Sequence, residues 1–150
     1  MSAVGLSTRP AGMAMTFMDA IRVIKKGDII RLRHDLDEGL DPSFANQFGS
    51  TLLMLAAIDG NTTIGRLLIE AGADLERQNH LRESALSLAV MFGHRGFVKL
   101  LLDSGASLSY FQERGSLASF LEWAERYCSV TSEQMRNIRF QLDKQAGSQS

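Results

Sequence analysis

The sequence is poor in several residue types, and each shortage narrows what the protein can be. Among 150 residues there are one cysteine (Cys128), two prolines and one tryptophan, and the formal net charge is only −1. A single cysteine excludes an intrachain disulfide framework and a multi-cysteine zinc site. The near-neutral charge argues against binding driven by attraction to phosphates, so we expect no nucleic-acid partner.

Long hydrophobic runs are also missing. The longest, residues 52–58, is far shorter than the ~20 residues that a membrane span needs. Arg9 and Pro10 lie where the apolar core of a secretory signal would be. We therefore expect no membrane association and a cytoplasmic location, which suits a lone free thiol. The small and polar residues at 1–15 and 146–150 predict flexible ends.

What the sequence does contain is a repeat of 33 residues. Aligning residues 46–78 with 79–111 gives ten identities, which is far above chance. Two sets of glycines keep the same period: Gly27, Gly60 and Gly93, and Gly39, Gly72 and Gly105. A fixed period of this length indicates a stack of similar units that share one core.

Each unit reads as two helices and a loop. Residues 51–59 are apolar, with the small residues Ala56 and Ala57 on one face, which predicts a short helix that packs closely. Gly60 ends it in a left-handed conformation. A second helix is expected to begin at Thr62 or Thr63 and to end at Gly72. The polar stretch that follows predicts an extended loop to the next unit.

These features resemble the ankyrin repeat. The matching segments are GSTLLMLAA at 49–57, RESALSLAV at 82–90 and LLLDSGA at 100–106. The resemblance implies an all-α ankyrin-repeat solenoid, with four stacked helix–turn–helix units and hairpin-like loops in a single domain at 16–145. Two full repeats, 46–78 and 79–111, would lie between divergent capping repeats.

Several details can be checked against a structure. In the first unit His34 and Asp35 replace apolar residues, and we expect solvent beside them because a terminal unit has one open side. Gly65 lies inside a helix where the next unit has Val98, so Gly65→Ala should stabilise the protein unless a neighbouring side chain packs against that Cα. In the last unit, Thr131 and Gln134 form the pattern of a capping box for a final helix that extends to Lys144.

No pattern for catalysis stands out. His34, His80 and His94 fall in different units, so they are not expected to share a metal ion, and His94 is interpreted as a helix cap. No histidine lies at a sequence spacing that indicates a catalytic pair with Cys128, which is therefore interpreted as an inert thiol. Trp123 is interpreted as part of the core. We predict that the protein is not an enzyme and that it has no catalytic residues, no cofactor and no metal site.

The resemblance implies that a partner meets the loop tips and the ends of the inner helices, which line a concave face. Many residues at these positions are apolar, which is typical of a covered surface. The alternative for some is burial: Phe48 onto the helix below it, and Tyr110 and Phe111 onto the last unit. The predicted protein-binding residues are Phe48, Ile58, Asp59, His80, Leu81, Glu83, Met91, Phe92, Tyr110, Phe111 and Arg114.

Function follows as a hypothesis. A chain of this size with no expected active site would act by occupying another protein, as an inhibitor, a neutralising (immunity-type) partner or a stabiliser. Four units offer one interface of standard size, which favours one dedicated partner over a multivalent scaffold. The alternative is a self-associating structural or scaffold protein, with the apolar residues serving a homodimer. The sequence does not name the partner.

Overall fold

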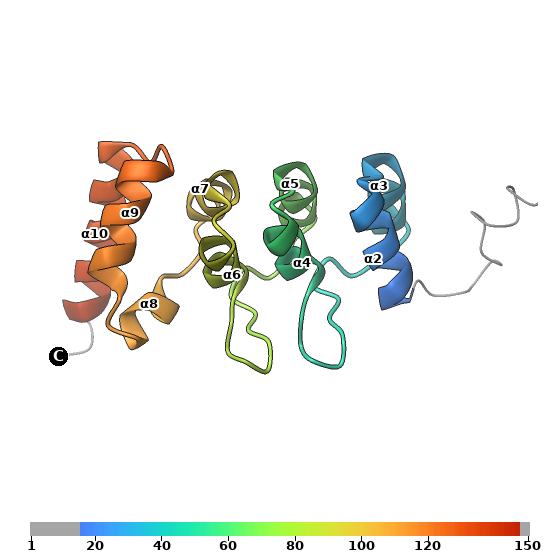
Figure 1. The fold of residues 1–150 in the computed structure, drawn as a ribbon, viewed down its shortest axis with the longest axis horizontal. Coiled ribbons are helices and arrows are strands. Elements are labelled where there is room, and N and C mark those ends of the chain that lie inside the picture. The colour runs from blue at the N-terminus through green and yellow to red at the C-terminus, as the bar shows by residue number, and fades with distance from the viewer. Residues whose placement is uncertain (1–15, 148–150) are drawn as a thin grey trace, which may run out of the picture.

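The computed structural model describes residues 16–147 as a row of stacked helix pairs (Figure 1). The predicted flexible end at 1–15 lies outside these residues, as do 148–150 of the predicted flexible end at 146–150, whereas 146–147 belong to the last helix. The helices are α2 (Phe17–Lys26), α3 (Ile29–Asp37), α4 (Leu52–Asp59), α5 (Thr62–Glu70), α6 (Ala85–Met91), α7 (Arg95–Asp103), α8 (Ser109–Glu113), α9 (Leu117–Tyr127) and α10 (Ser132–Gly147). The predicted all-α solenoid is confirmed within the described part of the chain.

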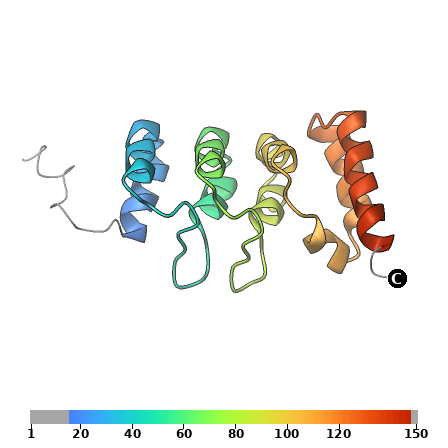
Figure 2. The ribbon, with the colours of Figure 1, turned by 180° about the vertical axis from the view of Figure 1, so that it is seen from behind.

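The pairs follow one another in chain order, and two rows of helices result. The inner helices α2, α4 and α6 pack against one another, and the outer helices α3, α5 and α7 form a second row on the side away from the loops (Figure 1). Two loops project from the same edge of the stack, one before α4 and one before α6, as the view from behind also shows (Figure 2). This arrangement places the loop tips and the inner helices on one side of the molecule.

The turns between inner and outer helices explain the glycine period. Gly27, Gly60 and Gly93 all have a left-handed backbone, with φ of 67°, 72° and 73°. Residues that carry a side chain rarely adopt this backbone conformation, whereas glycine does so without strain. The three glycines therefore occupy equivalent turns, and the predicted register of the repeats is correct.

Short polar residues begin the helices. The Asp28 carboxylate accepts a hydrogen bond from the Arg31 N–H at 3.0 Å, and the Asn61 side chain accepts one from the Ile64 N–H at 3.1 Å. Ser84 caps α6, where the Ser87 N–H donates to the Ser84 hydroxyl at 3.2 Å. These bonds satisfy amide groups that a helix start leaves without partners.

His94 occupies the third cap position, but the interpretation of its side chain as a cap is wrong. Its side chain makes no capping hydrogen bond. Instead, Nε2 lies 2.8 Å from the carbonyl oxygen of Ile58 in the preceding unit. The ring fits there because Gly60 has no side chain: a Cβ on Gly60 would lie 2.5 Å from Nδ1 of His94. The histidine therefore joins two neighbouring repeats.

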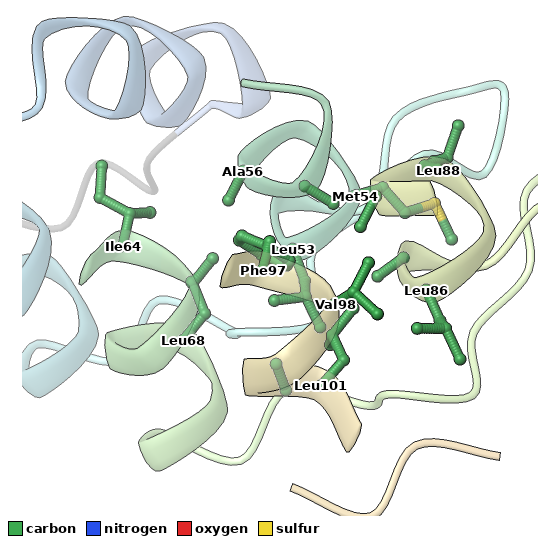
Figure 3. Close-up of a cluster of buried hydrophobic side chains, with 14 of the residues drawn as sticks. Leu53, Met54, Ala56, Ile64, Leu68, Leu86, Leu88, Phe97, Val98 and Leu101 are labelled. Carbon is green, nitrogen blue, oxygen red and sulfur yellow. The ribbon is translucent and has the colours of Figure 1, made fainter. Parts of the chain in front are cut away.

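The core is continuous from one repeat to the next (Figure 3). Leu53 and Leu86 are each 1% exposed, and Ala56 and Ala89 are fully buried, as the repeat predicts. Phe97 of α7 is fully buried and belongs to the same cluster as residues of α4 and α5. Burial of aligned apolar side chains across units is what holds a stack of short helices together.

Gly65 shows why one position differs between the repeats, and it corrects the prediction made for it. A Cβ on Gly65 would lie 2.5 Å and 2.6 Å from ring atoms of Phe97 and 3.2 Å from Cδ2 of Leu100. The α5 backbone at Gly65 and the Phe97 ring are therefore in close contact. The exception allowed for in the sequence argument applies, so Gly65→Ala is expected to destabilise the protein.

The two terminal units cover the ends of the stack. His34 is exposed as expected, but the expectation for Asp35 is wrong, since only 5% of it is exposed. Arg31 lies one turn before it and donates from Nε to both of its carboxylate oxygens, at 3.0 and 3.1 Å. At the other end, α10 extends three residues beyond the predicted Lys144.

The predicted capping box of the last unit is confirmed. The Thr131 N–H donates to the Gln134 side chain at 2.8 Å, and the Gln134 N–H donates to the Thr131 hydroxyl at 3.1 Å. The short helix α8 takes the place that an extended loop has in the two preceding units. The hairpin-like loops are therefore the two before α4 and α6.

Candidate protein-binding surface

The tips of the two loops carry exposed apolar side chains at the same repeat position. Phe48 is 60% exposed and Leu81, which lies 33 residues later, is 74% exposed. The alternative that Phe48 folds onto the helix below it therefore does not hold. The loops support each other, because the His80 N–H donates to the Phe48 carbonyl at 2.9 Å.

Hydrogen bonds within each loop hold the tips in place. In the second loop, the Asn79 amide donates to the Glu83 carboxylate at 3.0 Å, and the Asn79 N–H donates to the Glu83 carbonyl at the same distance. In the first, the Asn46 N–H donates to the Ser50 carbonyl at 3.0 Å. Glu83, a predicted binding residue, is thus half-buried and engaged with the loop itself.

The ends of the inner helices provide the second group of predicted residues. Met91 and Phe92 at the end of α6 are 59% and 51% exposed. At the corresponding positions of α4, Ile58 is half-buried and Asp59 is exposed. The Asp59 carboxylate lies 3.5 Å from Nζ of Lys25, on α2. The apolar surface of the inner helices is therefore greatest in the third unit.

The predicted residues around α8 divide into exposed and buried ones. Arg114 is exposed, and its guanidinium lies 3.9 Å from the centre of the half-buried Tyr110 ring. Phe111 is only 6% exposed and stacks on Phe120 of α9, with ring centres 4.1 Å apart and planes 6° apart. Phe111 is therefore part of the core in this structure, which corrects its expected place on the surface.

Two exposed residues escaped the sequence argument. Arg82 has φ of +62° where the equivalent residues, Gly49 and Gly115, are glycines. Tyr127, at the end of α9, is 43% exposed and lies under Arg95, whose guanidinium carbon is 4.8 Å from the ring centre. The first could have been found by continuing the glycine period to 49, 82 and 115, whereas nothing in the spacing marks Tyr127.

Two observations concern metal binding and the single thiol. Residues 16–147 contain no group of three or more His, Cys, Asp or Glu side chains that could hold a metal ion. Cys128 is 3% exposed, and burial raises the pKa of its thiol despite the opposing effect of the Arg95 charge. A thiol with a raised pKa is protonated at neutral pH and is a poor nucleophile. Trp123 is half-buried and belongs to the edge of the core, as interpreted from the sequence.

Comparison with known protein families agrees with this architecture. The family described as ankyrin repeats (3 copies) matches residues 17–111, which cover the first three helix pairs. The chain belongs to the ankyrin-repeat family. Ankyrin repeats are modules for protein–protein interaction and are typically not enzymes. No curated protein matches the chain closely enough to count as a relative.

Among the described residues, no helix is both long enough and apolar enough to cross a bilayer.

Proposed function

We propose that this protein binds one dedicated partner protein through its concave face and acts by occupying that partner, as an inhibitor or a stabiliser. The concave face is defined here as the ends of α2, α4 and α6 together with the tips of the two loops. One observation carries the proposal: four large apolar side chains on this face, Phe48, Leu81, Met91 and Phe92, are each more than half exposed. Such a concentration is unfavourable in water unless a partner covers it.

The backbone that carries these four side chains is held in place, which favours a role in binding. Phe48 and Leu81 are held on loops joined by the hydrogen bond between His80 and Phe48. Met91 and Phe92 end a helix whose remaining residues are nearly all buried. A preorganised backbone lowers the conformational entropy lost on binding, and aromatic side chains, with only two χ angles, add little to that loss. We therefore expect the concave face to bind a partner without a large change in its own conformation.

The proposal is tested by capturing proteins from an extract of the organism that encodes the chain. The wild-type protein and Phe92→Ala serve as baits, with Phe140→Ala as a matched control, because Phe140 is 64% exposed on α10, away from the concave face. We expect a protein that is recovered by the wild type and by Phe140→Ala, and that Phe92→Ala recovers poorly.

The recovered partner then decides between the mechanisms. A one-to-one complex in which the partner loses its own activity, or melts at a higher temperature, supports an inhibitor or stabiliser. A complex that leaves the partner unchanged and recruits a third protein would instead indicate a scaffold. A stable dimer of this protein alone at low concentration would mean that a second copy covers the apolar residues.

A further inference from the structure

The exposed surface of the inner helices changes in character along the stack. Two repeat positions face outward at the end of each inner helix. In α2 they hold Lys25 and Lys26, in α4 Ile58 and Asp59, and in α6 Met91 and Phe92. The same backbone positions are thus cationic in the first unit and apolar in the third. The units lie in a row (Figure 1), so the concave face is cationic at its first unit and apolar at its third.

The cations at the first unit are only weakly engaged within the protein. The side chains of Arg22 and Lys25 are 67% and 62% exposed, and their closest carboxylate oxygens, on Asp19 and Asp59, lie at 3.6 and 3.5 Å. Exposed pairs of this kind contribute little to stability. Lys26 takes part in no ion pair with the described residues. Three cations therefore lie at neighbouring positions of one helix, and two of them are paired with the carboxylates of Asp19 and Asp59.

One of those two carboxylates already has another role. Asp19 accepts hydrogen bonds from the Thr16 N–H at 3.2 Å and from the Thr16 hydroxyl at 2.7 Å, and so caps the start of α2. The Asp19 carboxylate thus interacts with the start of α2, at the opposite end of the helix from Lys25 and Lys26. The carboxyl end of a helix carries a partial negative charge, which favours Lys25 and Lys26 in the last turn without neutralising them. The exposed lysines therefore remain a local source of positive charge, to which carboxylates of a partner would be attracted.

The third unit supplies the apolar end of the concave face. Met91 and Phe92, at the end of α6, are both more than half exposed. In the next unit, the exposed ring of Tyr127 lies under the guanidinium of Arg95, which belongs to the start of α7. Methionine, aromatic and arginine side chains are those that most often carry binding energy in protein interfaces. Met91 and Phe92 therefore offer a contact for an apolar or aromatic anchor.

We infer that the partner segment bound on the concave face carries an apolar or aromatic anchor that contacts Met91 and Phe92, and a group of acidic residues that contacts Arg22, Lys25 and Lys26. This inference rests on the proposed function and fixes the orientation of the segment. The first and third units are two helix spacings apart, about 16–20 Å. The anchor and the acidic group are then separated by about 5–6 residues in an extended segment or about 11–13 in a helical one.

The probe is a phage-displayed library of random peptides about 20 residues long, which covers both spacings. The library is selected against the full chain, and the enriched peptides are synthesised for binding measurements by fluorescence anisotropy. Three variants are compared with the wild type: Phe92→Ala, the double variant Lys25→Glu/Lys26→Glu, and Arg33→Glu/Arg66→Glu. The last is a matched control, because Arg33 and Arg66 are exposed at equivalent positions of the outer helices α3 and α5.

We expect the enriched peptides to carry acidic residues at a fixed distance from an aromatic or aliphatic residue. Their dissociation constants should rise about tenfold in Lys25→Glu/Lys26→Glu, because like charges then meet, and should change little in Arg33→Glu/Arg66→Glu. Raised salt should weaken binding to the wild type. Circular dichroism of each variant shows whether it is folded.

Two other outcomes overturn the inference and can be told apart. Peptides that lose affinity for Phe92→Ala but have no acidic bias, or that bind Lys25→Glu/Lys26→Glu as well as the wild type, contradict the proposed chemistry of the partner and leave the concave face as the binding site. Peptides that bind Phe92→Ala as tightly as the wild type contradict the proposed function as well.

Discussion

The two full repeats, 46–78 and 79–111, have nearly the same backbone but different surfaces. Leu68 and Leu101 are both fully buried, as are Ala56 and Ala89. At the concave face, by contrast, Asp59 corresponds to Phe92 and Ile58 to Met91. Several positions that build the stack therefore keep their residues from one repeat to the next, whereas the exposed positions at the end of the inner helix do not. Within each repeat, the buried residues that support the stack are therefore distinct from the exposed residues available for binding.

Overpacking the shared core is the strongest way to test this comparison. Ala56 and Ala89 have no exposed surface, and each lies where neighbouring inner helices meet. Ala89→Leu should lower the free energy of unfolding by about 1–3 kcal/mol, and Ala56→Leu by a similar amount, because the added methylenes force side chains apart. Chemical denaturation measures both effects. Ala118→Leu, at an exposed position of α9, should change little; unchanged stability in Ala89→Leu would place the two alanines outside the core.

Gly65 tests a buried position at which the two repeats differ. Gly65→Ala should lower the free energy of unfolding by roughly 1–2 kcal/mol, since the new methyl meets the Phe97 ring and the gain in helix propensity offsets only part of the clash. In a Phe97→Leu background the same change should cost less, because the ring is gone. Thermal melting compares the two backgrounds.

A second helical glycine provides the control for Gly65. A Cβ on Gly96 of α7 would lie 3.6 Å from Cγ2 of Thr62, which is an ordinary contact. Gly96→Ala should therefore stabilise the protein by roughly 0.5 kcal/mol through helix propensity alone. If Gly65→Ala and Gly96→Ala had the same sign, close contact with Phe97 would not be the reason for the glycine.

Arg82 provides a stabilising change in a loop rather than in a helix. Its φ of +62° strains a side-chain-bearing residue, whereas Gly49 has the same conformation without strain. Arg82→Gly should raise the free energy of unfolding by about 1 kcal/mol. Gly49→Ala, the reciprocal change, should destabilise, since its Cβ would lie 3.2 Å from the Asn79 backbone. A loss of stability in Arg82→Gly would mean that the arginine side chain supports the loop.

The sequence alone predicts the features that recur every 33 residues. The turns at Gly27, Gly60 and Gly93, the buried alanines and the exposed loop tips all follow from the period and the binary pattern of apolar and polar residues. Contacts between different repeat positions do not follow. The fit of Phe97 against Gly65 and the bond from His94 to Ile58 depend on how one unit sits on the next, which no spacing within a unit specifies.

The last unit was harder to predict because it leaves the period. The helix α8 replaces a loop there, so Phe111 turns into the core and stacks on Phe120 instead of reaching the surface. The helix α9 has 11 residues, compared with 7 in α6, so positions near its end no longer match the repeat. Tyr127 becomes exposed as a result, and a register carried over from the preceding units cannot place it.

The central claim is that the exposed apolar side chains of the concave face bind a protein and are not needed for folding. The most direct measurement is the dissociation constant of the partner for Phe92→Ala and for Phe140→Ala, together with the melting temperature of each variant. The account predicts that Phe92→Ala weakens binding at least about tenfold, equivalent to about 1.4 kcal/mol, with a nearly unchanged melting temperature, and that Phe140→Ala alters neither. A destabilised Phe92→Ala whose folded fraction binds normally would contradict it, as would loss of binding in Phe140→Ala alone.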